Sequence, residues 1–193
     1  EATRERSEAS RTEECQEGAY SGLINDVGAR RRVGLLPLAD GQLNNRQEEV
    51  VLRQEALALT RRGEWSNWGG TLTGSDDTAI RAAALNNEQG AINALGSLDM
   101  QLSGRLDNGS GRIFSRRSQV IQAQDIVNIQ GWMGSQAGWR AVSGTFDNHQ
   151  GSVQSQQDAT LAATDLNNEL GTLQSAAGLA LHAAAGGQAR QHF

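Results

Sequence analysis

The sequence predicts an all-β fold, a parallel β-helix of about eight stacked coils of 20 residues. A motif reading apolar, any residue, Asn, any, any, Gly, any, apolar recurs at a period near 20, and the segments between its copies alternate apolar and polar residues. A fixed period of this length indicates a repeat architecture. The eight copies begin at Leu23, Leu43, Trp65, Leu85, Leu106, Ile126, Phe146 and Leu166.

The third motif position holds Asn in all eight copies, at successive spacings of 20, 22, 20, 21, 20, 20 and 20 residues. An inward Asn amide at a turn can bond the backbone and also its copy in the next coil, so this column predicts an Asn ladder. The sixth position holds Gly except at Glu48, and Gly suits a positive φ or a tight corner. The predicted ladder consists of Asn25, Asn45, Asn67, Asn87, Asn108, Asn128, Asn148 and Asn168.

The segments between the motifs carry a strand pattern. After Val153, for example, small or branched apolar residues alternate with Gln, Ser, Thr and Asp as far as Leu166. This alternation has the period of two that is typical of β-strands, and no window offers a long helix with capped ends. One 20-residue unit cannot bury its apolar face alone, whereas stacked units cover one another.

The unit Leu-Asp/Asn-Asn-x-x-Gly-x-Ile/Val/Leu resembles the haemagglutinin repeat of filamentous haemagglutinin and of contact-dependent growth-inhibition exoproteins, both of the bacterial two-partner secretion family. The resemblance runs from about Leu23 to Ala184 and is most specific from Leu85 onward. It implies a right-handed β-helical filament, secreted to the bacterial cell surface and used for adhesion or toxin presentation. It also implies an outer-membrane secretion transporter as a partner, engaged through a domain that is not in this sequence.

The chain divides into three parts. Residues 1–22 mix Glu and Arg and form a charged N-terminal arm, which reads as a short helix, an irregular solvated segment or a cap over the first coil. Residues 23–185 form the β-helix repeat domain, and residues 186–193 form a tail without the motif. The start at Glu1 without an apolar leader suggests a fragment of a longer protein.

Composition argues against several classes of function. The net charge of −5 makes nucleic acid an unexpected partner, and no apolar run is long enough to predict a membrane span. Cys15 is the single cysteine, and His149 and His182 take outward positions without Cys or carboxylate at metal spacing. We therefore expect no metal site, no cofactor and no catalytic residue.

Two functions from different classes fit a β-helix. The first is a structural and adhesive filament segment that contacts a host or bacterial cell-surface receptor or a glycan. The alternative is a β-helical carbohydrate-active enzyme, a polysaccharide lyase or hydrolase, which needs paired carboxylates on one face. Asp99, Asp125 and Asp165 recur at similar coil positions and are the candidates for such a pair. Because the acids are otherwise scattered, we favour the filament and predict no enzyme activity.

The four tryptophans separate into core and surface positions. Trp65 takes the apolar first motif position and is predicted in the core, and Trp139 takes a strand position held by Ala159 and Leu179 in other coils, so it is predicted at least partly buried. Trp68 and Trp132 take motif positions four and seven, which face solvent. Exposed indoles near Arg112 and Arg140 can stack on a sugar or a partner, so Trp68 and Trp132 form the candidate binding face.

Overall fold

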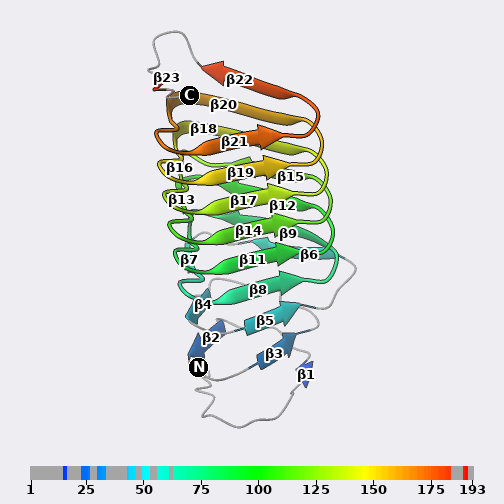
Figure 1. The fold of residues 1–193 in the computed structure, drawn as a ribbon. Coiled ribbons are helices and arrows are strands. Elements are labelled where there is room, and N and C mark those ends of the chain that lie inside the picture. The colour runs from blue at the N-terminus through cyan, green and yellow to red at the C-terminus, as the bar shows by residue number, and fades with distance from the viewer. Residues whose placement is uncertain are drawn as a thin grey trace.

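The chain winds as a parallel β-solenoid (Figure 1). The computed structural model describes residues 63–183 without a break, together with the strand segments 15–16, 23–26, 30–33, 43–46, 49–52, 56–60 and 189–190. In Figure 1 the strands of the near sheet run from left to right while the chain climbs from its N-terminal end, so the coil is right-handed, as predicted. All the elements described are strands, and the fold class is all-β.

Each turn of the solenoid has three sides, which we call the first, second and third sides in chain order. The second side is a nine-stranded sheet in which every described pair is parallel. It consists of β1 (Cys15–Gln16), β3 (Arg30–Val33), β5 (Glu49–Leu52), β8 (Thr71–Gly74), β11 (Ala91–Ala94), β14 (Arg112–Ser115), β17 (Trp132–Ser135), β19 (Ser152–Ser155) and β21 (Thr172–Ser175).

The first and third sides belong to one 14-stranded sheet because two long strands, β18 (Trp139–Asp147) and β20 (Ala159–Asn167), run through both. The first side contains β2 (Leu23–Asp26), β4 (Leu43–Arg46), β7 (Glu64–Ser66), β10 (Ala84–Asn86), β13 (Arg105–Asp107), β16 (Asp125–Val127) and β23 (Ala189–Arg190). The third side contains β6 (Ala56–Thr60), β9 (Asp77–Ala82), β12 (Leu98–Leu102), β15 (Gln119–Gln122) and β22 (Leu179–Ala183).

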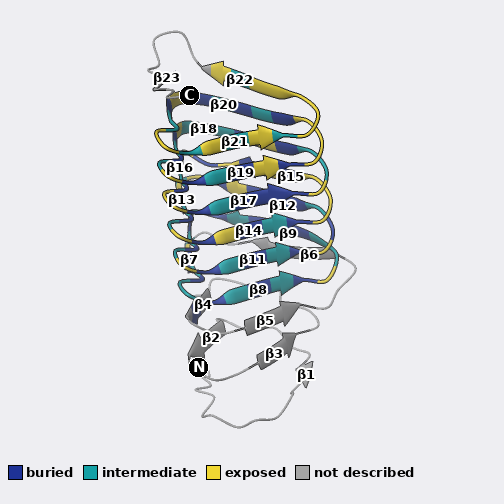
Figure 2. Cartoon of the chain, in the orientation of Figure 1, coloured by how far each residue is buried: buried dark blue, intermediate teal, exposed yellow. Residues whose placement is uncertain are grey.

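Strand register follows the sequence motif. On the first side Leu85 pairs with Leu106, and on the second side Ile92 pairs with Ile113. Equivalent motif positions therefore stack directly above one another, which places each apolar column inside the coil. Figure 2 shows this as a buried interior along the stack, with more exposed residues on the last coil at β21 and β22.

The core consists of one apolar column from each side of the coil. The three columns are completed by two large aromatic side chains, Trp65 and Phe146, which are among the most deeply buried. A third aromatic side chain, Trp139, together with aliphatic and Met side chains, fills the rest. The core includes Leu85, Leu106 and Ile126 on the first side, Ile92, Ile113 and Met133 on the second side, and Ile80, Met100 and Ile121 on the third side.

The solenoid has about six turns rather than the eight predicted. The motif copies at Leu23 and Leu43 supply β2 and β4 to the stack, but a three-sided turn with its side chains described starts at β7. The predicted arm at residues 1–22 lies outside the described residues except for β1, and its form stays a prediction. Within the predicted tail, β23 pairs with β20, and the rest also lies outside the described part.

Candidate functional site

The Asn ladder is present along the whole described stack. From Asn45 to Asn148, each side chain donates from Nδ2 to Oδ1 of the ladder Asn in the next coil, and all six bonds measure 2.7 Å. These six donors are buried, while Asn168 at the end of the series is half-buried. Asn25 is in backbone register with Asn45, and its side chain lies outside the described residues.

Each ladder amide also bonds the backbone in two coils. Asn128 Nδ2 lies 3.3 Å from the carbonyl oxygen of Gly131 in its own coil and 3.4 Å from that of Ser152 in the next. The same pair of contacts recurs at the other ladder positions from Asn67 to Asn148. The Asn ladder therefore provides hydrogen-bond donors for carbonyl groups at a corner where the backbone hydrogen bonds between strands are interrupted.

Of the two reasons predicted for the motif Gly, a positive φ is wrong and a tight corner is confirmed. The left-handed residue of this corner is the one before it, such as Gln130 with φ of 55° and Gln150 with φ of 53°. At Gly131 a Cβ atom would overlap the carbonyl oxygen of Asn108 in the preceding coil, and the other motif glycines from Gly70 to Gly171 meet the same obstacle. Close approach of two coils, rather than a positive φ, selects Gly there.

The second motif position closes the same turn. Oδ1 of Asp107 accepts a hydrogen bond from Gly109 N at 3.0 Å, and Oδ1 of Asp147 accepts one from His149 N at 3.1 Å. Asn86 and Asn167 do the same in their coils. These acids are therefore turn residues, since Asn and Asp side chains commonly bond the backbone two residues later.

Sequence reasoning missed a second column of bonds between coils. Ser135 Oγ lies 2.7 Å from the carbonyl oxygen of Arg117, and Ser155 Oγ lies 2.8 Å from that of Ala137, in each case in the preceding coil. Ser175 repeats the contact with Gln157 at 2.6 Å. The signal was present in the sequence, because these serines follow one another at the coil period.

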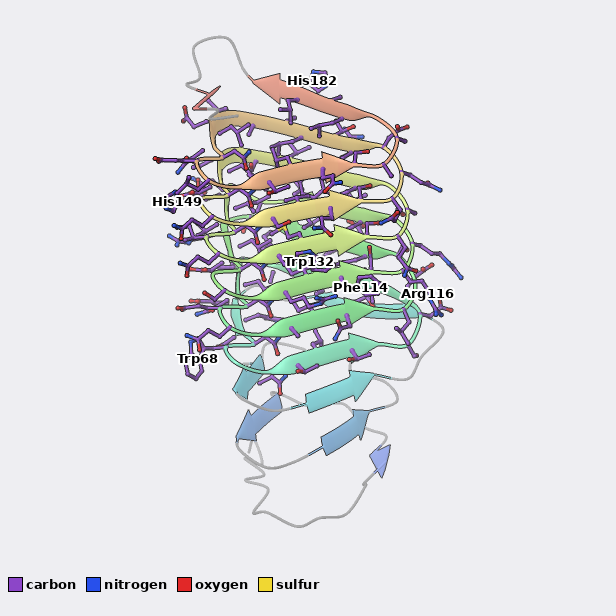
Figure 3. All side chains as sticks on the ribbon, viewed as in Figure 1. Trp68, Phe114, Arg116, Trp132, His149 and His182 are labelled. Atoms are coloured by element: carbon purple, nitrogen blue, oxygen red, sulfur yellow. The ribbon has the colours of Figure 1, made fainter. Side chains whose placement is uncertain are left out.

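The two candidate surface tryptophans lie on different parts of the rod. Trp68 is in the corner between β7 and β8, whereas Trp132 opens β17 on the second side, and both are half-buried. Figure 3 shows Trp68 at the edge of the stack and Trp132 on the face of the near sheet. The register from Thr71 through Arg112 to Trp132 separates them by three coils, or roughly 14 Å at the usual strand spacing.

Trp132 belongs to a small aromatic group that we call the Trp132 cluster, formed by Arg112, Phe114, Trp132 and Gly134. The Arg112 guanidinium carbon lies 4.0 Å from the indole centroid, a cation–π distance. The Phe114 ring lies 6.4 Å away at an interplanar angle of 22°. A Cβ atom on Gly134 would overlap the indole, so the ring lies across this glycine. Arg140, the other arginine expected nearby, is on β18 at the third side.

The other two tryptophans are in the core, as predicted. Trp65 is 1% exposed and Trp139 is 2% exposed. Trp139 Nε1 donates to Gln119 Oε1 at 3.0 Å, and Gln119 Nε2 donates to the carbonyl oxygen of Gly134 at 3.1 Å. Gln119 therefore links a buried indole to the strand that carries the Trp132 cluster.

The three candidate acids do not share one coil position, and the prediction that they do is wrong for Asp99. Asp125 and Asp165 lie on the first side with Thr145 paired between them, so they are two coils and roughly 10 Å apart at the usual spacing. Asp99 lies on the third side, where its carboxylate is 3.5 Å from Arg81 Nη2. The strand register therefore separates Asp99 from the other two acids and leaves a whole coil between Asp125 and Asp165.

One acid does have a distinctive environment. Asp77 Oδ1 accepts hydrogen bonds from Ser97 N at 2.7 Å and Ser97 Oγ at 2.8 Å, and Arg117 Nη1 lies 3.5 Å from it. The backbone bond from Ser97, its hydroxyl bond and the Arg117 charge together lower the pKa of Asp77. Asp77, Ser97 and Arg117 together join three successive coils at the corner between the second and third sides. This contact gives Asp77 a structural role.

Histidine positions agree with the prediction. His149 sits at the ladder corner with Nδ1 3.9 Å from Glu169 Oε2, and His182 is exposed on β22 (Figure 3). Within the described part of the chain, no three His, Cys, Asp or Glu side chains gather closely enough to hold a metal ion. The same residues include no helix that is long and apolar enough to cross a membrane.

Comparison with known proteins gives no match: no protein-family model, no curated protein and no solved structure is similar to this chain. The resemblance to haemagglutinin-type repeats therefore stays a prediction, which depends on the motif and its spacing. The class that the fold defines is a parallel β-solenoid with an internal Asn ladder.

Proposed function

We propose that this chain is a structural and adhesive filament segment of a secreted bacterial surface exoprotein, one that extends a stalk and contacts a receptor or glycan. The unbroken Asn ladder carries the proposal. Seven side chains, six of them buried, are joined by six bonds of equal length in a single line. Such a line ties each coil to the next and suits a molecule whose task is to span distance.

Hydrogen bonds at the second corner also tie successive coils together. The serine column from Ser135 to Ser175 bonds successive coils at the second corner, and the strand pairs keep one register along each side. Each added coil lengthens the rod by about 4.8 Å. A secretion transporter in the outer membrane is part of the same proposal, which the motif resemblance supports.

The adhesive part of the proposal depends on departures from the repeat. Other coils carry Thr71, Ala91 and Ser152 where Trp132 lies, so the Trp132 cluster interrupts a surface of small side chains. An indole with an adjacent guanidinium can stack on a ring and bond its hydroxyl groups. Trp68 provides a second aromatic departure at the ladder corner.

The test is binding of the chain to cells and to a glycan array, compared with a Trp68→Ala, Trp132→Ala double variant. The wild type and the double variant must show the same β circular dichroism. We expect binding by the wild-type chain and its loss in the double variant. Equal binding by both would remove these indoles from the adhesive surface.

A second assay separates a filament from an enzyme. The chain is incubated with a panel of polysaccharides, and release of reducing or unsaturated ends is measured for the wild type and for Asp125→Ala. We expect no turnover by either. Turnover that disappears in Asp125→Ala would replace the filament proposal by the carbohydrate-active enzyme.

A further inference from the structure

Asn108 and Gly109 form the one Asn-Gly pair in the sequence, and Asn108 is the fourth of the seven ladder residues from Asn45 to Asn168. Asn followed by Gly has a known chemical weakness. The Gly nitrogen can attack the Asn side-chain carbonyl because Gly has no Cβ and its backbone reaches the required conformation easily. The ladder thus carries one reactive position near its middle.

The folded coil blocks that reaction in two ways. The attacking group, Gly109 N, is held by Asp107 Oδ1 at 3.0 Å. The Asn108 side chain is fully buried, where it accepts from Asn87 Nδ2 and donates to Asn128 Oδ1, both at 2.7 Å. Bringing Gly109 N to Asn108 Cγ requires both sets of bonds to break.

Packing does not explain why this position holds Gly. Equivalent residues in other coils are large: Trp68, Glu88, Ile129, His149 and Glu169. The left-handed residue of the turn is Ser110, with φ of 51°, rather than Gly109. A Cβ atom on Gly109 would have Asp107 Oδ1 at 3.2 Å and Glu88 Cγ at 3.6 Å as its nearest neighbours. The coil can therefore hold a side chain here with a slight adjustment of two exposed or half-exposed groups.

We propose that Asn108–Gly109 is a self-modification site controlled by folding, which stays intact in the stacked coil and deamidates in chains that remain unfolded. Gly109 N bonds to Asn108 Cγ and loses its proton, the bond from Cγ to the side-chain nitrogen breaks, and that nitrogen takes up a proton and leaves as ammonia. Water then opens the resulting succinimide to Asp or to isoaspartate. No other reactant is needed.

The product cannot rejoin the ladder. A carboxylate at position 108 can accept the bond from Asn87, but it has no proton to donate to Asn128 Oδ1 or to the carbonyl oxygens of Gly111 and Trp132, which the amide now contacts. Isoaspartate also lengthens the main chain by one carbon and shifts the strand register. Chains that stay unfolded for too long therefore lose the ability to fold into the stacked coil.

The experiment follows deamidation by peptide mass spectrometry in the full chain, both folded and in urea, at mildly alkaline pH. Asn148, which is followed by His149, is the internal reference. The matched variant is Gly109→Glu, because Glu88 and Glu169 occupy this position in other coils. After incubation in urea the samples are diluted, and the fraction that regains β circular dichroism is compared with the fraction modified.

In urea we expect Asn108 to react at least about tenfold faster than Asn148, and folding to slow Asn108 by about tenfold or more, because reaction then requires local opening. Gly109→Glu should bring Asn108 down to the rate of Asn148. The wild-type chain should lose refolding in proportion to modification, and the variant should not. Equal rates at Asn108 in folded and unfolded chains, or full refolding of modified chains, would overturn the proposal. The comparison of Asn108 with Asn148 in the wild type decides the first point even if the variant does not fold.

Discussion

Asn128 Nδ2 donates to Asn148 Oδ1 at 2.7 Å, and both side chains are buried between adjacent coils. Asn128 Oδ1 in turn accepts from Asn108 Nδ2 at the same distance. Every amide in the described ladder therefore points the same way along the rod. Aligned amides polarise one another, so removal of one affects its neighbours on both sides.

Asn128→Ala is expected to lower the free energy of unfolding by about 1–3 kcal/mol, because it leaves Asn108 without its acceptor and Asn148 without its donor. Gln150→Ala is the control. It removes an exposed side chain that accepts a 2.9 Å bond from Gln130 Nε2, and we expect it to cost less than about 0.5 kcal/mol. Urea unfolding followed by circular dichroism measures both. Similar small losses in the two variants would argue that the ladder contributes little to stability.

Gly131→Ala is expected to be more damaging than its size suggests. Its Cβ would overlap the Asn108 carbonyl oxygen and Asn128 Oδ1, so two coils must separate to admit it. We expect a loss of about 3 kcal/mol or more, at the upper end for single substitutions. Gly138→Ala is the matched control, since its Cβ would meet Asp158 O at an ordinary 3.5 Å. A Gly131→Ala protein as stable as Gly138→Ala would contradict the close approach of the coils.

Asp77 predicts a pH dependence. Because its pKa is lowered from the ordinary value of 3.8, its stabilisation is complete above that value and is lost as the pH falls through the lowered one. The Asp77→Asn variant should therefore differ from the wild type by a constant amount at neutral pH and converge with it in acid. The side chain is half-exposed, so we expect a small effect. Thermal unfolding at several pH values measures it.

Ser97→Ala is the companion variant for Asp77. It removes the hydroxyl donor but keeps the backbone donor, which is the larger cause of the lowered pKa. Ser97→Ala should therefore keep part of the pH-dependent stabilisation that Asp77→Asn loses entirely. A Ser97→Ala protein with no pH-dependent stabilisation at all would assign the effect to the hydroxyl instead.

The stack and the ladder could be predicted because both depend on a short motif that repeats in register. When Asn87 and Asn108 hold the same place in successive units, stacking brings their amides together whatever the details of each side. The positions of Trp65 and Trp139 in the core follow from the same comparison between coils. A local pattern was enough wherever the nearest neighbour in space is the equivalent residue of the next copy.

The features that could not be predicted from the sequence depend on contacts that the motif does not describe. The reason for Gly131 lies in the preceding coil, where the Asn108 carbonyl approaches it. The sequence pattern groups Asp99 with Asp125 and Asp165. Asp99 is, however, closer in sequence to the ladder Asn before it, which places it on another side of the coil. The Trp132 cluster needs Gly134 two residues later and Arg112 one coil earlier, a combination that occurs once among the described coils.

The last prediction concerns the position of the Trp132 indole across Gly134. Gly134→Ala places a methyl group where the indole now lies, and the indole can rotate away because it is at the surface. We expect the free energy of unfolding to change by less than about 1 kcal/mol, while Trp132 fluorescence shifts to the red as the ring loses Arg112 and Phe114. If the Trp132 cluster is the adhesive surface, Gly134→Ala should bind cells or glycans as weakly as Trp132→Ala, although it still carries the indole. Full binding by Gly134→Ala with loss in Trp132→Ala would show that the indole ring is sufficient for binding. Its present position against Gly134 would then not be required.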